Sequence, residues 1–158
     1  MKKSLNLTRG ALIAALYVVL TLISNAVGLA NGAVQLRISE ALTVLPMFTS
    51  SAITGLFIGC LISNLLTDGV ISNIIFGSLA TLIGAIFTRV FKKNTFLACL
   101  SPILSNTIIV PFILIYSYGA EVTYPYFALT VFAGEAISVF ALGLPLISAL
   151  KKRPELYQ

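Results

Sequence analysis

Long apolar runs separated by short polar segments dominate the pattern of this chain. Five runs cover roughly residues 7–29, 41–67, 70–91, 96–116 and 126–150. Crossing the hydrocarbon of a membrane takes about twenty helical residues, whereas barrel strands would alternate over about ten. The run 41–67 is too long for one helix, and the polar stretch "MFTSSAITG" breaks it near Thr49–Ser51. The pattern therefore predicts membrane-spanning helices, two of them short.

Basic residues decide how many helices cross. Positive clusters flank the cytoplasmic ends of membrane helices, so an even number of crossings should separate successive clusters. Dividing the run 41–67 satisfies this rule and gives six helices, with the second at about Ser39–Phe48 and the third at about Ala52–Asp68. Both termini are then cytoplasmic. The clusters are Lys2/Lys3/Arg9, Arg89/Lys92/Lys93 and Lys151/Lys152/Arg153.

Composition supports an all-α integral membrane protein. Of 158 residues, 58% are hydrophobic and only 9% are charged, which a soluble domain of this size could not bury. We expect one transmembrane domain over 1–158 in the plasma membrane, an extracellular loop or lid at 30–40 and a cytoplasmic tail at 151–158. The net charge of +5 lies at helix ends and does not indicate nucleic-acid binding.

Enzyme chemistry has few candidate residues. The chain has no His, and its Cys residues lack the spacing of metal ligands, so neither a metal nor a cofactor is expected. It also lacks the G-x-x-x-x-G-K-[ST] loop that would bind ATP. We expect no enzyme activity from this chain.

Polar residues concentrate in the outer half of the predicted bundle, which favours an outward-opening binding site. Glu135 is the strongest candidate, because a carboxylate within the membrane normally faces a partner or a cavity. A structural hydrogen bond to a neighbouring helix is the alternative. Gly134 beside it permits close approach of a backbone or a ligand.

The segment "VQLRISEAL" carries two more candidates, Arg37 and Glu40. Its alternation suits a short extended stretch, after which Ser39 is predicted to N-cap a helix with Glu40 in the first turn. Stabilising that helix end is an alternative role for Glu40. Arg37 could equally be an interfacial residue that reaches water.

Three asparagines complete the candidate ligand contacts: Asn64, Asn73 and Asn106. The Asn106 amide could instead bond to a neighbouring helix. Small residues at four-residue spacing, Gly10/Ala14 and Ala11/Ala15, mark a face of the first helix that permits close helix packing.

The run "VQLRISEALTVLPMFTSSAITGLFIGCLISNLL", followed by "IIFGSLATLIGAIFTR", resembles the queuosine-precursor transporter family. The resemblance extends from "TRGALIAALYVVLT" to the last helix, and "QLRISEAL" and "FGSLATL" are its specific parts. It implies a six-helix substrate-binding (S) component of an energy-coupling factor (ECF) transporter. Such a component works with a membrane coupling subunit, against which Ala11 and Ala15 would pack, and with two cytoplasmic ATPases.

The resemblance also implies a ligand, a 7-deazaguanine precursor of queuosine. Its guanine-like edge presents adjacent N–H donors that a carboxylate can accept. We expect Glu135 to bind this edge, Glu40 to lie in the lid beside it, Arg37 to serve the carbonyl or hold Glu40, and the asparagines to satisfy the remaining groups. Alternatives are an S component for another vitamin, such as riboflavin or thiamine, a non-transporting membrane scaffold, or a stand-alone uptake protein.

Overall fold

The computed structural model describes residues 2–29, 34–67, 69–119 and 121–157, and these are helical with no strand among them. η2 and α3 form one continuous helix, and α5, η3 and α6 form another, so the major elements amount to the six helices predicted. η1 is a 3-10 helix, and η2 and η3 are π-helical segments. In chain order the elements are α1 (Lys2–Ala26), η1 (Ile38–Met47), α2 (Ser51–Thr67), η2 (Asn73–Gly77), α3 (Ser78–Val90), α4 (Thr95–Tyr118), α5 (Tyr124–Ala136), η3 (Ile137–Gly143), α6 (Leu144–Lys151) and the short η4 (Pro154–Leu156).

In the part of the chain that the structure describes, four helices are long and apolar enough to cross a membrane, namely Ser4–Ala26, Asn73–Val90, Thr95–Tyr118 and Tyr124–Lys151. η1 has 10 residues and α2 has 17. At about 2.0 and 1.5 Å per residue they reach about 20 and 26 Å, less than the roughly 30 Å of hydrocarbon. The short second and third helices are thus confirmed, and they end close to the predicted break.

η1 lies at the centre of the bundle, against α1, α2, α3, α4 and η3. Its residues from Ser39 to Val44 are all buried, as are Pro46 and Met47. Leu42 joins a hydrophobic cluster with α1 and α2, while Val44 joins a second cluster with α4 and η3. The most buried element of the fold is therefore also the one that carries Glu40.

The predicted N-cap at Ser39 is wrong. The helix begins at Ile38, and Ser39 lies inside it, where its hydroxyl accepts a hydrogen bond from Thr21 Oγ1 at 2.8 Å. α1 takes over the capping role, because Ser24 Oγ accepts from the backbone N–H of Ile38 at 2.9 Å. A tertiary partner thus replaces the local cap that the sequence suggested.

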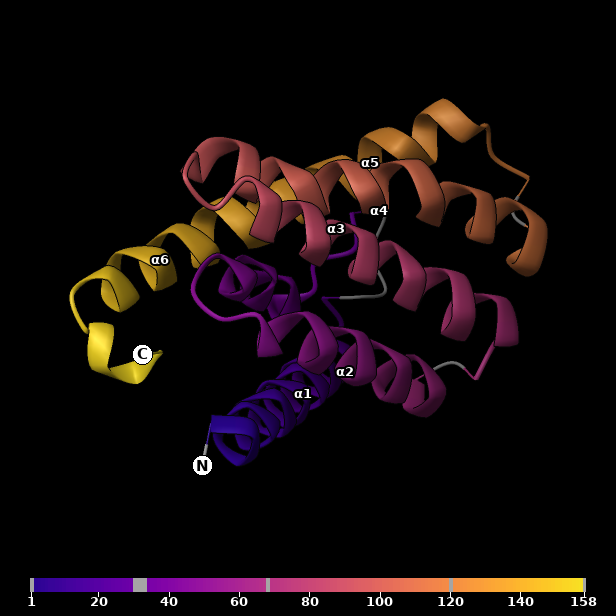
Figure 1. Ribbon diagram of the computed structural model, residues 1–158. Coiled ribbons are helices and arrows are strands. Elements are labelled where there is room, and N and C mark those ends of the chain that lie inside the picture. Colours follow the sequence, from indigo (N-terminus) through magenta and orange to yellow (C-terminus); the bar gives the residue numbers. More distant parts are fainter. Residues whose placement is uncertain (1, 30–33, 68, 120, 158) are drawn as a thin grey trace.

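α1 and α2 lie side by side along their length (Figure 1). Gly10 and Ala14 are buried on the face of α1 that meets Gly55 and Gly59 of α2. A Cβ on Gly55 would lie 2.6 Å from the carbonyl oxygen of Gly10, so the two backbones can approach this closely only with glycine there. The predicted small-residue contact therefore exists within the chain, and Ala11 and Ala15 lie outside it.

The basic clusters share one end of the bundle. The start of α1, the end of α6 and the turn between α3 and α4 all lie towards the left-hand end of the bundle in Figure 1. Arg9 at the start of α1 donates to the carbonyl oxygen of Tyr157 at 3.0 Å, and Lys151 donates to Thr95 Oγ1 at 3.3 Å. This common end is what the positive-inside rule requires of a six-helix topology with cytoplasmic termini.

Candidate functional site

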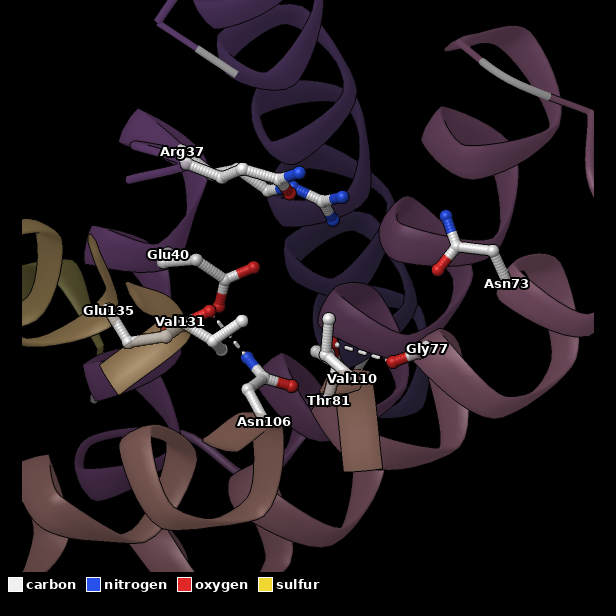
Figure 2. Close-up of a pocket in the computed structure, with 10 residues that line it drawn as sticks. Arg37, Glu40, Asn73, Gly77, Thr81, Asn106, Val110, Val131 and Glu135 are labelled. Atoms are coloured by element: carbon white, nitrogen blue, oxygen red, sulfur yellow. Dashed lines mark hydrogen bonds between the residues drawn. The ribbon is translucent and has the colours of Figure 1, made fainter. Parts of the chain in front are cut away.

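A small polar cavity of about 30 Å³ lies inside the bundle (Figure 2). Five of the six predicted ligand contacts line it: Arg37, Glu40, Asn73, Asn106 and Glu135. Figure 2 shows Glu40 and Glu135 approaching from one side and Asn73 and Gly77 from the other. The remaining lining residues are Gln35, Gly77, Thr81, Val110 and Val131. Residues far apart in the sequence thus converge on one polar space.

Glu40 enters the cavity from η1 and is only 2% exposed. Its Oε1 accepts a hydrogen bond from the hydroxyl of Tyr17, a fully buried residue of α1, at 2.5 Å. Its Oε2 is buried and has no hydrogen-bond partner among the described residues. An unpaired buried carboxylate oxygen is costly, so this atom marks a place where a ligand donor would be favourable.

Glu135 repeats this arrangement on α5. Its Oε1 accepts a hydrogen bond from Nδ2 of Asn106, on α4, at 2.8 Å (Figure 2). Its Oε2, like that of Glu40, is buried and has no hydrogen-bond partner in the described part of the chain. A hydrogen bond to a neighbouring helix was the alternative role that the sequence allowed for both Glu135 and Asn106, and this bond between them is such a contact. It occupies one carboxylate oxygen and leaves the other unpaired.

Arg37 supplies positive charge to the same cavity, and its guanidinium is always charged in proteins. Among the described residues, no ion pair or hydrogen bond joins its side chain to Glu40 or Glu135. The cavity therefore combines one permanent cation with two carboxyl groups that have no ionic partner in the described part of the chain.

The extended segment 34–37 closes over the cavity from the far end of α1. The N–H of Leu36 donates to the carbonyl oxygen of Leu29 at 2.9 Å. On the other side the segment lies directly on α5, where a Cβ on Gly134 would collide with the carbonyl oxygen of Gln35. The close approach expected at Gly134 is thus a backbone contact. Residues 30–33 of the predicted lid lie outside the described residues.

Asn64 is the predicted contact that does not line the cavity. Its Nδ2 donates to the carbonyl oxygen of Asn73 at 3.2 Å, and its buried Oδ1 has no hydrogen-bond partner within the described residues. It therefore lies behind Asn73 and supports the start of η2. In the described structure Asn64 contacts a residue of the cavity wall but does not line the cavity itself.

Sequence reasoning missed several residues at the cavity. Gln35 shares a face of the extended segment with Arg37, so the alternation of polar and apolar residues there could have indicated that Gln35 faces the cavity too. Thr81, four residues after Gly77, donates to the carbonyl oxygen of Gly77 at 3.3 Å. Tyr17 was detectable as a lone phenol in the middle of an apolar helix. Val110 and Val131 carried no signal, because aliphatic residues are common in every helix here.

Ala11 and Ala15 lie on the outside of the bundle, and neither lines the internal cavity. Both are exposed and line an apolar groove of about 740 Å³ between α1 and α2. The predicted partner face is thus an open surface of the described structure.

The helices and the cavity define a multi-pass membrane protein with a buried, charged internal site. The sequence profile of the family described as QueT transporter matches residues 7–152. The chain belongs to this family of transporters, and the resemblance inferred from "QLRISEAL" and "FGSLATL" is confirmed. Membership in a transporter family agrees with the expectation that the chain is not an enzyme.

One relative is the queuosine precursor transporter QueT of Lactococcus lactis subsp. cremoris, strain MG1363. The two are 34% identical over 98 residues, which cover 60% of this chain and 57% of the relative. The match thus spans little more than half of that protein's length. No solved structure shows a significant match.

Proposed function

We propose that this chain is the substrate-binding S component of an ECF-type importer and that it captures a 7-deazaguanine precursor of queuosine. One observation carries the proposal: Glu40 and Glu135 line the same cavity, and each has a buried carboxylate oxygen with no hydrogen-bond partner among the residues that the structure describes. A precursor of queuosine is the cargo in the name of the Lactococcus relative.

The chemistry of the cavity matches that of the ligand. A guanine-like edge presents a ring N–H and an amino group side by side, and a carboxylate accepts both. Glu135 binds this edge, with Asn106 fixing the orientation of its carboxylate. Arg37 donates to the adjacent carbonyl, and Asn73 and Gln35 bond to the remaining polar atoms of the base. The aliphatic Val110 and Val131 contact the faces of the ring.

The cavity must widen when the ligand binds. Its volume of about 30 Å³ holds water rather than a bicyclic base, since pockets for small molecules span about 300–1,000 Å³. The segment 34–37 is the wall best suited to move, because it belongs to no helix and lies on Gly134 through Val34 and Gln35. Its displacement opens the site towards the outer face of the membrane.

The chain delivers its cargo through partners. It has no ATP-binding loop of its own, so a membrane coupling subunit and two cytoplasmic ATPases provide the energy. The groove with Ala11 and Ala15 receives the coupling subunit, because small side chains allow helices to approach closely in lipid. This groove lies on the outside of α1 and is separate from the residues that line the cavity.

Mass spectrometry of small molecules that co-purify with the protein tests the proposed cargo. We expect a 7-deazaguanine, and a panel titration should show binding of that class but not of riboflavin or thiamine. Binding of a vitamin instead would contradict the cargo and leave an S component of another specificity. Absence of any small-molecule binding would contradict the transport function and favour a scaffold.

A further inference from the structure

A second polar pocket lies at the basic end of the bundle. It has a volume of about 310 Å³ and brings together the start of α1, the turn between η1 and α2, the end of α3 and the C-terminal tail. Its lining is Leu5, Asn6, Arg9, Phe48, Thr49, Ser50, Arg89 and Tyr157. None of these residues lines the cavity of Glu40 and Glu135.

Two arginines give this pocket its charge. Arg9 donates through Nη1 to the carbonyl oxygen of Tyr157 at 3.0 Å. Arg89 donates through Nη1 to the carbonyl oxygens of Pro46 and Met47 at 3.1 and 3.2 Å. These bonds fix both half-buried head groups through neutral carbonyl oxygens, and none of the described residues that line the pocket is Asp or Glu. A guanidinium has five N–H donors, so each retains donors for an anion.

The turn that precedes α2 adds neutral donors. The hydroxyl of Ser50 lines the pocket beside Thr49, and α2 begins at the next residue, Ser51. The N-terminus of a helix of this length favours a negative group through its dipole. The two guanidinium groups, the hydroxyls and the helix end together suit a phosphate.

The pocket and the apolar groove between α1 and α2 are neighbours, because Asn6 lines both. From Asn6 to Val19, α1 rises about 20 Å, which exceeds the roughly 15 Å depth of one leaflet's hydrocarbon. The groove walls are small or aliphatic residues of the two helices, including Gly10, Ala14 and Ile58. A charged end that leads into an apolar groove matches a molecule with an anionic head and an acyl chain.

We propose that this surface binds one anionic phospholipid, with its phosphate at Arg9 and Arg89 and an acyl chain along the groove between α1 and α2. The lipid comes from the leaflet at the basic end, which is cytoplasmic by the positive-inside rule. The lipid then occupies the face of Ala11 and Ala15. If the proposed function holds, the lipid leaves this face when the coupling subunit docks. Lipid binding itself does not depend on that function.

Native mass spectrometry of the purified chain, mixed with phosphatidylglycerol or phosphatidylcholine, tests the head-group site. We expect one tightly bound phosphatidylglycerol and at least about tenfold weaker retention of phosphatidylcholine. Arg9→Gln and Arg89→Gln should each weaken phosphatidylglycerol binding about tenfold, and Arg9→Lys should restore part of it. Lys92→Gln is the matched control, because Lys92 is exposed and lies outside the pocket.

A second variant tests the acyl-chain groove. Ala15→Phe fills the groove and should weaken phosphatidylglycerol binding, whereas Ala141→Phe, on an exposed position of η3, should not. Arg9→Lys and the groove variants keep the proposal falsifiable if Arg89→Gln fails to fold. Equal retention of both lipids would overturn the proposal, and so would unchanged lipid binding in the arginine variants. The proposal would also be overturned if inorganic phosphate displaced the lipid and Ala15→Phe left lipid binding unchanged.

Discussion

At the scale of single residues, the site is built around two carboxylates, and in the described structure each has a hydrogen-bond partner at only one of its two oxygens. Tyr17 holds one oxygen of Glu40, and Asn106 holds one oxygen of Glu135. Both acids were detectable in the sequence, because a carboxylate in an apolar helix is costly and needs a reason. Their partners were harder to find. A tyrosine or an asparagine costs less in a helix, and only the packing of α1 and α4 reveals which atom each one touches.

Tyr17→Phe should weaken ligand binding without removing the carboxylate. The change removes the hydroxyl that orients Glu40 and should cost about 1 kcal/mol of stability, together with about tenfold in affinity. Tyr124→Phe is the matched control, because Tyr124 also loses one bond, to the carbonyl oxygen of Ile108, but lies outside the cavity. Calorimetric titration and thermal unfolding measure both effects. Equal affinities of the two variants would contradict a positioning role for Tyr17.

At the scale of elements, hydrophobic pattern and basic clusters sufficed to predict six helices and the break before Ser51. The pattern could not predict that η1 would be a 3-10 helix at the centre of the bundle. It also misplaced the cap at Ser39, because Ser24 of α1 does that work from another element. Local signals locate helices well, whereas the choice of capping partner depends on tertiary packing.

Gly134→Ala tests the contact between α5 and the segment 34–37. The new Cβ would collide with the carbonyl oxygen of Gln35, which belongs to backbone and has little freedom to yield. Overpacking of this kind costs about 1–3 kcal/mol, and here it displaces Gln35 and Arg37 from the cavity. We expect a lower unfolding temperature and weaker ligand binding in the same titration. Wild-type affinity would show that the segment does not form the binding wall.

Ala11→Phe combined with Ala15→Phe tests the outer face of α1. Both positions are exposed and lie apart from the cavity, so the isolated chain should bind its ligand with unchanged affinity. Transport by the complete complex should be lost, because bulky side chains prevent close helix packing. Ala141→Phe serves as the exposed control and should transport normally. Normal transport by the double variant would refute the coupling role.

At the scale of the whole molecule, charge is segregated between the two ends and the interior. The basic end gathers Arg9, Arg89 and Lys151, while the internal cavity holds two acids and one arginine. Positive-inside reasoning predicted this polarity from sequence alone. The sequence could not show that five candidate residues from four segments would share one cavity, because that depends on how the helices cross.

The internal charge also predicts which form of the precursor binds better. The cavity holds two carboxyl groups and one arginine, and a cationic ligand would stabilise the ionised form of the carboxyl groups that it contacts. We therefore expect the aminomethyl 7-deazaguanine to bind at least about tenfold more tightly than the nitrile form. Competition between the two forms, measured with purified protein, checks this order. A preference for the nitrile form would contradict the assignment of both carboxylates to the ligand.

The most direct test of the central claim is a calorimetric titration of the purified protein with the aminomethyl 7-deazaguanine. Wild-type protein and Glu121→Gln, an exposed control, should bind the ligand with the same affinity. The double variant Glu40→Gln/Glu135→Gln should remain folded and lose binding by at least about a hundredfold, or about 2.7 kcal/mol. Equal affinities of the double variant and the wild type would contradict the claim that this cavity holds the precursor.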